Sequence, residues 1–167
     1  QIVQDILSKT VDNISLEKFN IKTSSDLRKY TKSKFISVEK NDVYKYKLIH
    51  TPKQTVYSSR PHKFQDGYKV FISTTDKYKV FVDECGMTQS IVFILCADEE
   101  QAKKYIQISE HPLYVFINNI CRWGNFNNIR ILQSFPIPNI SYSGNKQEIY
   151  DYFNITEDEI KYITANL

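Results

Sequence analysis

Glycine and histidine are scarce in this sequence, and their scarcity excludes several chemistries. No glycine stands within two residues of another, so the chain has neither a GxGxxG motif nor a Walker-type phosphate loop. The three histidines, His50, His62 and His111, are too scattered to predict a ligand set, and HExxH and GxSxG motifs are missing. We therefore predict no catalytic residues and no metal site in this chain.

Cysteine and long apolar runs are also limited. Cys85, Cys96 and Cys121 form no CxxC pair and lie in apolar segments, which favours buried, reduced thiols in a cytoplasmic protein over a metal or redox site. No window of about eighteen apolar residues exists, so no membrane-spanning segment is predicted. The chain starts at Gln1 without an initiator methionine or a signal-peptide pattern, and we expect it to be a piece of a longer protein.

Charge is distributed unevenly along the chain. Residues 1–82 contain 16 Lys and Arg against eight Asp and Glu, whereas residues 83–167 contain six against 11. The basic half favours a polyanionic partner, and an ordinary lysine-rich surface explains the same numbers equally well.

The apolar pattern predicts an α+β domain, with a mixed, mostly antiparallel sheet, helices on one face and a small C-terminal helical tail. The longest apolar run, residues 90–96, predicts a central strand covered on both faces. Two helices should follow, one over residues 98–108 and one from Pro112 to a stop at Gly124. In the second helix, the apolar positions should face the strand: Leu113, Phe116, Ile117 and Ile120.

The ends of the chain predict smaller elements. Residues 2–7 fit a short helix or strand, and residues 26–30 fit a helix of one or two turns. After a linker at residues 141–145, two helices should cover residues 146–153 and 156–163, the second opening with a Thr156–Glu159 capping box.

The middle of the basic half predicts strands and one exposed connection. Residues 43–49 alternate apolar and lysine side chains, as in a half-exposed strand. Residues 51–67 are interpreted as a long, basic, exposed loop. The tetrapeptide Tyr-Lys-Val-Phe occurs at residues 68–71 and 78–81 and predicts a β-hairpin. Its lysines should lie on the polar side and at the tip.

Residues 122–130 are the candidate binding segment, with two arginines, three asparagines and two aromatic residues. Lys and Arg bind phosphates, whereas Asn and Arg read adenine and guanine edges. Trp123 and Phe126 either stack on a base or wedge into a duplex, or they anchor the core while the asparagines cap and turn the chain. The candidate DNA-contacting residues are Arg60, Lys63, Lys69, Lys77, Lys79, Arg122, Trp123, Asn125, Asn127, Asn128 and Arg130. For the lysines and Arg60, phosphate contact competes with a solvated surface.

Five stretches together suggest a family. They are Thr88-Gln-Ser-Ile-Val-Phe93, His111-Pro-Leu-Tyr-Val-Phe-Ile-Asn118, Arg122-Trp-Gly-Asn-Phe-Asn127, Ile131-Leu-Gln-Ser-Phe-Pro-Ile-Pro138 and Glu148-Ile-Tyr-Asp-Tyr-Phe-Asn-Ile-Thr-Glu-Asp-Glu-Ile160. They resemble the C-terminal target-recognition region of adenine-specific DNA methyltransferases of restriction–modification systems, the TaqI-like or Eco57I-like specificity domains. The resemblance covers roughly residues 55–165 and consists of ordinary residue types, without a catalytic signature.

The resemblance implies a division of labour. In that family an N-terminal domain binds S-adenosylmethionine and methylates a flipped adenine through an Asn/Asp-Pro-Pro-Tyr/Phe motif, and a C-terminal domain selects the sequence. Pro-Pro occurs nowhere in this chain. The resemblance therefore implies a DNA target-recognition domain at residues 1–140, with a helical tail at residues 141–167 packed on it.

The expected partners follow from the same resemblance. They are double-stranded DNA and the N-terminal catalytic domain of the same chain, which would carry the S-adenosylmethionine; this chain alone should bind no cofactor and transfer no methyl group. The parent protein is expected to be an adenine-specific methyltransferase, with or without a fused endonuclease. The alternatives are a protein-interaction module that docks a partner subunit and a single-stranded RNA-binding domain.

Overall fold

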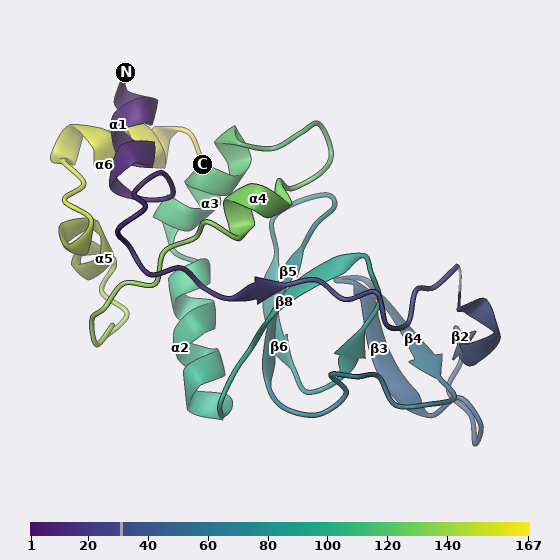
Figure 1. The fold of residues 1–167 in the computed structure, drawn as a ribbon. Coiled ribbons are helices and arrows are strands. Elements are labelled where there is room, and N and C mark those ends of the chain that lie inside the picture. Colours follow the sequence, from purple (N-terminus) through teal and green to yellow (C-terminus); the bar gives the residue numbers. More distant parts are fainter. Residues whose placement is uncertain (31) are drawn as a thin grey trace.

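The computed structural model describes residues 1–30 and 32–167, which form a helical layer and two sheets (Figure 1). The first sheet has the strand order β1-β8-β5-β6, and every neighbouring pair in it is antiparallel. Its strands are β1 (Ile21–Lys22), β8 (Ile91–Leu95), β5 (Lys69–Ser73) and β6 (Val80–Asp83). The predicted central strand and the predicted hairpin are thereby confirmed.

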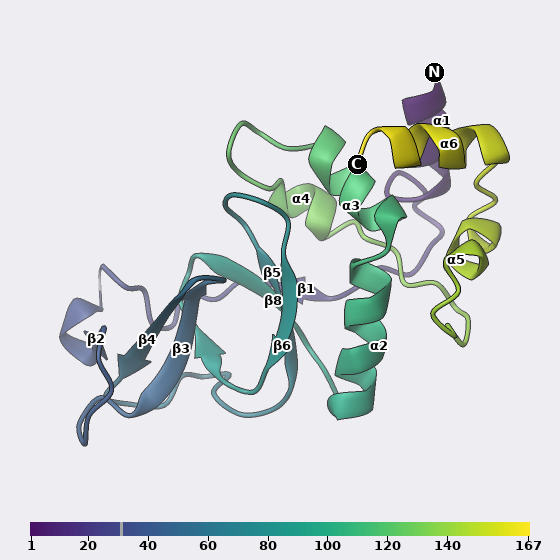
Figure 2. The same ribbon diagram turned by 180° about the vertical axis from the view of Figure 1, so that it is seen from behind.

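The second sheet has the order β2-β4-β3-β7. Its strands are β2 (Ile36–Ser37), β4 (Gln54–Ser58), β3 (Tyr46–Thr51) and β7 (Gly86–Met87). Only the β3–β7 pair is parallel, so the strands are mostly antiparallel. Figure 2 shows the second sheet on the side of the first sheet that is remote from the helices. The α+β class is confirmed, with the strands divided between two sheets.

The helices lie on one side of the first sheet (Figure 1). They are α1 (Ile2–Lys9), α2 (Glu99–Ser109), α3 (Pro112–Ile120), α4 (Ile129–Leu132), α5 (Lys146–Tyr152) and α6 (Glu157–Ala165). A 3-10 helix at Ser33–Phe35 lies apart from them, directly before β2 of the second sheet. Local capping explains where several begin. At the start of α2, the Asp98 carboxylate accepts a hydrogen bond from the backbone N–H of Gln101. The predicted Thr156–Glu159 capping box begins α6. Within the described residues, no helix is long and apolar enough to cross a membrane.

The first sheet separates two hydrophobic cores, because successive side chains of a strand point to opposite faces. Val92 and Ile94 pack into the core shared with the helices, and Phe93 between them packs into the core shared with the second sheet. Residues of the C-terminal helices, such as Ile149 and Ile163, belong to the same core as α3. Both faces of β8 are thus covered, which explains its unbroken apolar sequence.

Three predicted elements are wrong. Residues 51–67 are not one loop, because residues 54–58 form β4 and pair with β3 across a two-residue turn at Pro52 and Lys53. Residues 26–30 form turns and not a helix, and the 3-10 helix comes after them. Helix α3 ends at Ile120, whose side chain is exposed, and so it stops before Gly124.

Candidate nucleic-acid interface

The turn between β5 and β6, residues 74–79, lies beside the segment that follows α3, residues 121–128 (Figures 1 and 2). We call the first the hairpin tip and the second the α3–α4 loop. The backbone N–H of Asp76 donates to the backbone carbonyl of Asn125 at 3.0 Å, and the backbone N–H of Asn127 donates to the backbone carbonyl of Thr74 at 2.9 Å. Arg122 Nη2 donates to the Asp76 carbonyl at 2.6 Å. The two segments predicted to bind DNA are therefore brought together in the fold.

Asn127 fastens these two segments from inside the protein. Its Nδ2 donates to the Ser73 carbonyl at 2.7 Å, and its Oδ1 accepts from Asn118 Nδ2 at 3.1 Å. The side chain is buried. The prediction that Asn127 contacts a base is therefore wrong, because both polar atoms of its side chain already form hydrogen bonds that hold the loop.

Trp123 and Phe126 project from the α3–α4 loop, with 66% and 59% of their surfaces exposed. Their backbones exchange two hydrogen bonds of 3.0 Å, which closes a turn around Gly124 and Asn125. Gly124 has a φ of +60°, and Asn125 does not have a positive φ. A positive φ at only the first central residue is the pattern of a type II′ turn, which favours glycine there. The alternative that the two aromatic rings anchor the core is wrong.

The polar residues of the loop and of the first turn of α4 differ in how exposed they are and in how many of their groups already have partners. Asn128 is half-buried, and its Oδ1 caps α4 by accepting from the Arg130 amide at 3.1 Å. The Asn125 and Arg130 side chains are exposed. Among the described residues, Arg130 forms no ion pair. Asn125 of the loop and Arg130 of α4 are therefore the polar residues best placed to reach a ligand.

A hollow of about 610 Å³ lies between the hairpin tip and the α3–α4 loop. We call it the aromatic hollow. Its wall contains hydroxyl, amide and aromatic groups and no carboxylate. The lining residues are Thr74, Thr75, Gln89, Ser90, Trp123, Phe126, Asn127, Asn128, Ile129 and Arg130. Gln89 and Ser90 are not among the candidate residues of the sequence analysis, because they stand at the start of the predicted central strand.

A second hollow of about 380 Å³ lies on the other side of the hairpin tip, where the β3–β4 turn approaches it. We call it the lysine hollow. Lys53, Lys77 and Lys79 line it together with one acid, Asp76, whose carboxylate lies 3.9 Å from Lys53 Nζ. Lys53 was missed in the sequence because residues 51–67 were interpreted as a loop. The strand-favouring residue types Thr55, Val56 and Tyr57, which closely follow Pro52-Lys53, were the available signal of a second strand.

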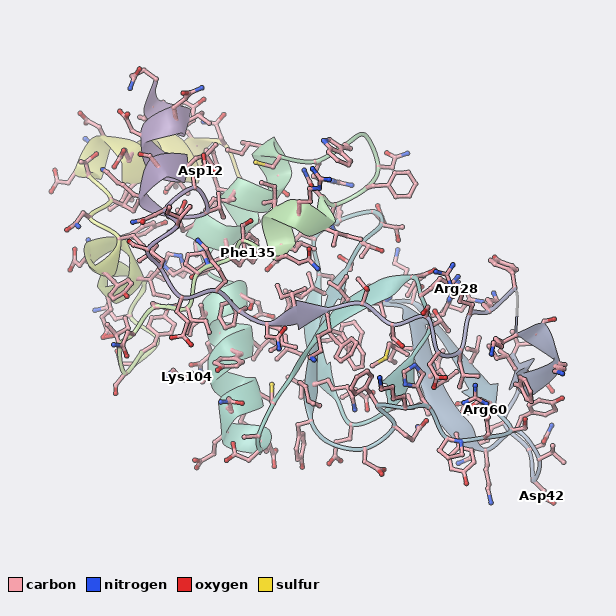
Figure 3. The ribbon with its side chains drawn as sticks, in the orientation of Figure 1. Asp12, Arg28, Asp42, Arg60, Lys104 and Phe135 are labelled. Atoms are coloured by element: carbon pink, nitrogen blue, oxygen red, sulfur yellow. The ribbon has the colours of Figure 1, made fainter. Side chains whose placement is uncertain are left out.

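Arg60 and Lys63 lie elsewhere. Figure 3 places Arg60 on the lobe formed by the second sheet, away from the hairpin tip. Its Nη2 lies 3.3 Å from Asp26 Oδ1, and its guanidinium covers the Phe35 ring at 5.3 Å. Burial raises the pKa of Asp26, but hydrogen bonds from the Lys63 amide and from Arg60 outweigh it and leave the pKa below its ordinary value. Asp26 thus stays ionised and offsets the Arg60 charge.

Lys69 is buried, which contradicts the prediction that it lies on the polar side of the hairpin. Its Nζ donates to the carbonyl oxygens of Asp66 and Gly67 at 2.9 and 2.8 Å. Desolvation lowers the pKa of Lys69. The ammonium stabilises the turn before β5 and does not reach the surface.

The buried histidines have structural partners. The Phe64 amide donates to His62 Nδ1 at 2.8 Å, so a neutral His62 carries its proton on Nε2 and donates it to Ser24 Oγ at 3.0 Å. In that tautomer His62 is a donor to Ser24 and not a base for it. Among the described residues, no group of three His, Cys, Asp or Glu side chains is arranged to hold a metal ion.

The predicted residues thus fall into three groups. Those that converge around the hairpin tip are Lys77, Lys79, Arg122, Trp123, Asn125, Asn128 and Arg130. Arg60 and Lys63 lie on the second-sheet lobe, and Lys69 and Asn127 are buried. No protein-family model matches this chain, and no curated protein matches it in sequence.

Proposed function

We propose that this chain binds double-stranded DNA through the surface around the hairpin tip. The observation that supports the proposal is the contact between the hairpin tip and the α3–α4 loop, which are more than forty residues apart in sequence. Each segment alone has a composition suited to DNA, and a duplex requires both kinds of group on one surface. Lysines for phosphates and amide or guanidinium groups for base edges meet there.

The chemistry of each group suits a distinct part of the duplex. Lys77 and Lys79 are exposed and form no ion pair among the described residues, so their charges are free for backbone phosphates. Arg130 and Asn125 carry the donors and acceptors that distinguish guanine and adenine in the major groove. The hydrogen bonds of Arg122 and Asn127 hold the loop rigidly, which lowers the entropy lost on binding.

The biological setting belongs to the same proposal. The chain is the target-recognition part of an adenine-N6-specific DNA methyltransferase of a restriction–modification system, acting in the cytoplasm. S-adenosylmethionine binding and methyl transfer fall to an N-terminal catalytic domain of the same protein, with or without a fused endonuclease.

The proposal is tested by fluorescence anisotropy with a pool of labelled duplexes at about 50 and 200 mM salt. We expect binding that weakens with salt, because each phosphate contact releases about 0.9 counterion. The double substitution Lys77→Ala with Lys79→Ala should reduce the salt slope by about two. Lys104→Ala is the matched control, since Lys104 is an exposed lysine on α2, away from the hairpin tip (Figure 3).

The outcome that rejects the proposal is equally specific. Absence of salt-dependent duplex binding by the chain, at micromolar concentrations and low salt, would contradict it. Equal effects of Lys104→Ala and of the hairpin-tip substitutions would place the DNA surface elsewhere.

A second candidate function is protein binding, and one observation favours it. Trp123, Phe126 and Ile129 form an exposed apolar group beside Arg130. Trp and Arg are the residue types that dominate the energetics of protein interfaces. If Trp123→Ala removes binding of a partner subunit and duplex DNA does not compete with that partner, this second function is correct and the first is not.

A further inference from the structure

The hairpin tip is a ridge with a different hollow on each side. Thr75 lines both hollows, so the aromatic and lysine hollows are neighbours across a single turn of backbone. Thr74 and Asp76, on either side of Thr75, are held by backbone hydrogen bonds to the α3–α4 loop. The two hollows therefore have a fixed separation, and a ligand with two different chemical parts can occupy both.

The aromatic hollow suits the flat face of a base. Trp123 and Phe126 are mostly exposed, and the surrounding wall offers hydroxyl and amide groups and the Arg130 guanidinium. Aromatic rings stack on bases of any identity, and nearby polar groups bind base edges. A base inside a closed duplex is already covered on both faces by its neighbours. Only a base that has left the stack can place its face on these rings.

The lysine hollow suits a phosphate. Lys53 and Lys77 come from two different hairpin turns, and Lys79 adds a third ammonium against the single carboxylate of Asp76. The hollow is therefore positive by two charges among its lining residues. A phosphodiester is the charged group that every nucleotide of a strand carries, and it is linked to the base through the sugar.

We propose that a DNA strand crosses the hairpin tip with one unpaired nucleotide bound across the ridge. Its base stacks on Trp123 and Phe126 in the aromatic hollow, and an adjoining phosphate lies among Lys53, Lys77 and Lys79. This inference rests on the DNA-binding function proposed above and adds the class of substrate, which is a duplex with an unpaired nucleotide at the contact. It also assigns a phosphate-binding role to Lys53.

The experiment compares three labelled duplexes of one sequence: fully paired, with a single-nucleotide bulge, and with an abasic site in the bulge. Trp123 is the only tryptophan in the chain, so fluorescence excited at a wavelength that tyrosine does not absorb reports on this site alone. We expect the bulged duplex to bind about tenfold more tightly than the paired one, because stacking of the base contributes to the free energy of binding. The stacked base should also quench the Trp123 fluorescence, because it lies against the indole ring. The abasic bulge should lose both effects. Trp123→Ala should lose the preference for the bulge, and Trp123→Phe should keep most of it.

A second test uses a substitution of Asp76 that we expect to increase the affinity for DNA. Asp76 has a φ of +58°, a conformation that Asn also tolerates, so Asp76→Asn removes the charge and keeps the turn. We expect Asp76→Asn to bind all three duplexes several-fold more tightly and Lys53→Ala to bind them several-fold more weakly. Lys104→Ala should leave binding unchanged.

The outcomes separate the inference from the function on which it rests. If the paired and bulged duplexes bind equally with salt dependence, and Trp123 fluorescence is unchanged, the inference is wrong while the proposed function stands. A loss of affinity with Asp76→Asn, or a preference for RNA of the same sequence over DNA, also overturns it. If none of the duplexes binds, the inference and the proposed function are both rejected.

Discussion

Acidification should destabilise this protein through His111, and replacing His111 with Asn should remove that part of the pH dependence. His111 is buried at the start of α3, where its Nδ1 accepts from the Leu113 amide at 3.0 Å. Its Nε2 donates to the Lys146 carbonyl at 2.9 Å, and its ring packs edge-on against Tyr150. The neutral ring thus joins α3 to α5. A proton on Nδ1 would face the Leu113 N–H and break the cap.

The sign of the effect follows from the pKa. Burial lowers the pKa of His111 from 6.5 to about 4, although the hydrogen bond to the Lys146 carbonyl raises it. Between these two values the unfolded chain binds a proton that the folded protein does not, so the free energy of unfolding decreases as the pH falls. The contribution of the neutral His111 to the free energy of unfolding is fully present above the pKa of His111 in the unfolded chain. About 2 kcal/mol of it should be lost between roughly pH 7 and pH 5.

The assay is urea unfolding followed by circular dichroism at both pH values, for the wild type and for His111→Asn. Asn keeps an oxygen that caps the Leu113 amide and does not titrate. It loses the hydrogen bond to Lys146, so the variant should be less stable by about 1–2 kcal/mol near neutral pH. Because the other acid-sensitive groups are common to both proteins, the difference between them isolates His111. A difference that is the same at both pH values would refute the reasoning.

Three further substitutions test particular contacts, each by urea unfolding. Gly86→Ala should destabilise the protein by about 1–3 kcal/mol, because a Cβ there would lie 2.7 Å from His62 Cβ; wild-type stability would contradict the close packing. Asn127→Ala should cost about 2 kcal/mol and also weaken duplex binding, since it frees the α3–α4 loop; unchanged binding would show that the loop holds its shape without it. Thr156→Ala should cost about 1 kcal/mol through the lost cap, whereas Thr164→Ala, exposed near the other end of α6, should be nearly neutral; equal losses would contradict a capping role.

The elements that were predicted correctly have local signals. Asp98, Pro112 and Thr156 each stand at or just before the first turn of a helix, and the groups that they cap or accommodate are within three residues. The two Tyr-Lys-Val-Phe tetrapeptides mark two strands that pair across a short turn, with Phe71 opposite Phe81. Such contacts depend only on neighbouring residues, so the order of residue types is sufficient to predict them.

The errors come from contacts that are distant in sequence. Strand β4 contains polar residues and follows Pro52, and it is a strand because β2 and β3 pair with its two edges. Lys69 alternates with apolar residues as an exposed lysine would, but two backbone carbonyls of the preceding turn bind its ammonium inside the protein. Composition does not show either set of partners.

The candidate site was predicted as two segments, and its geometry depends on the contact between them. Asn127 was a candidate for base contact because of its residue type, which is the same for an asparagine that reads a base and one that fastens a loop. Its burial and its hydrogen bonds to Ser73 and Asn118 decide between these roles. Lys53 joins the site only through the pairing of β3 with β4.

The exposed rings of Trp123 and Phe126 are the feature that folding alone does not explain. Exposing a large aromatic ring forgoes the stabilisation that burial would provide, typically about 2 kcal/mol or more. A flexible turn would let such rings fold back onto the apolar surface. Here the turn is held away from the core by hydrogen bonds of Arg122, Asn125 and Asn127 to the hairpin tip, and by two buried hydrogen bonds of the Asn127 side chain to Ser73 and Asn118. A rigid support for two unburied rings beside free cations is what a binding surface for flat, anionic ligands requires, and a nucleic acid is such a ligand.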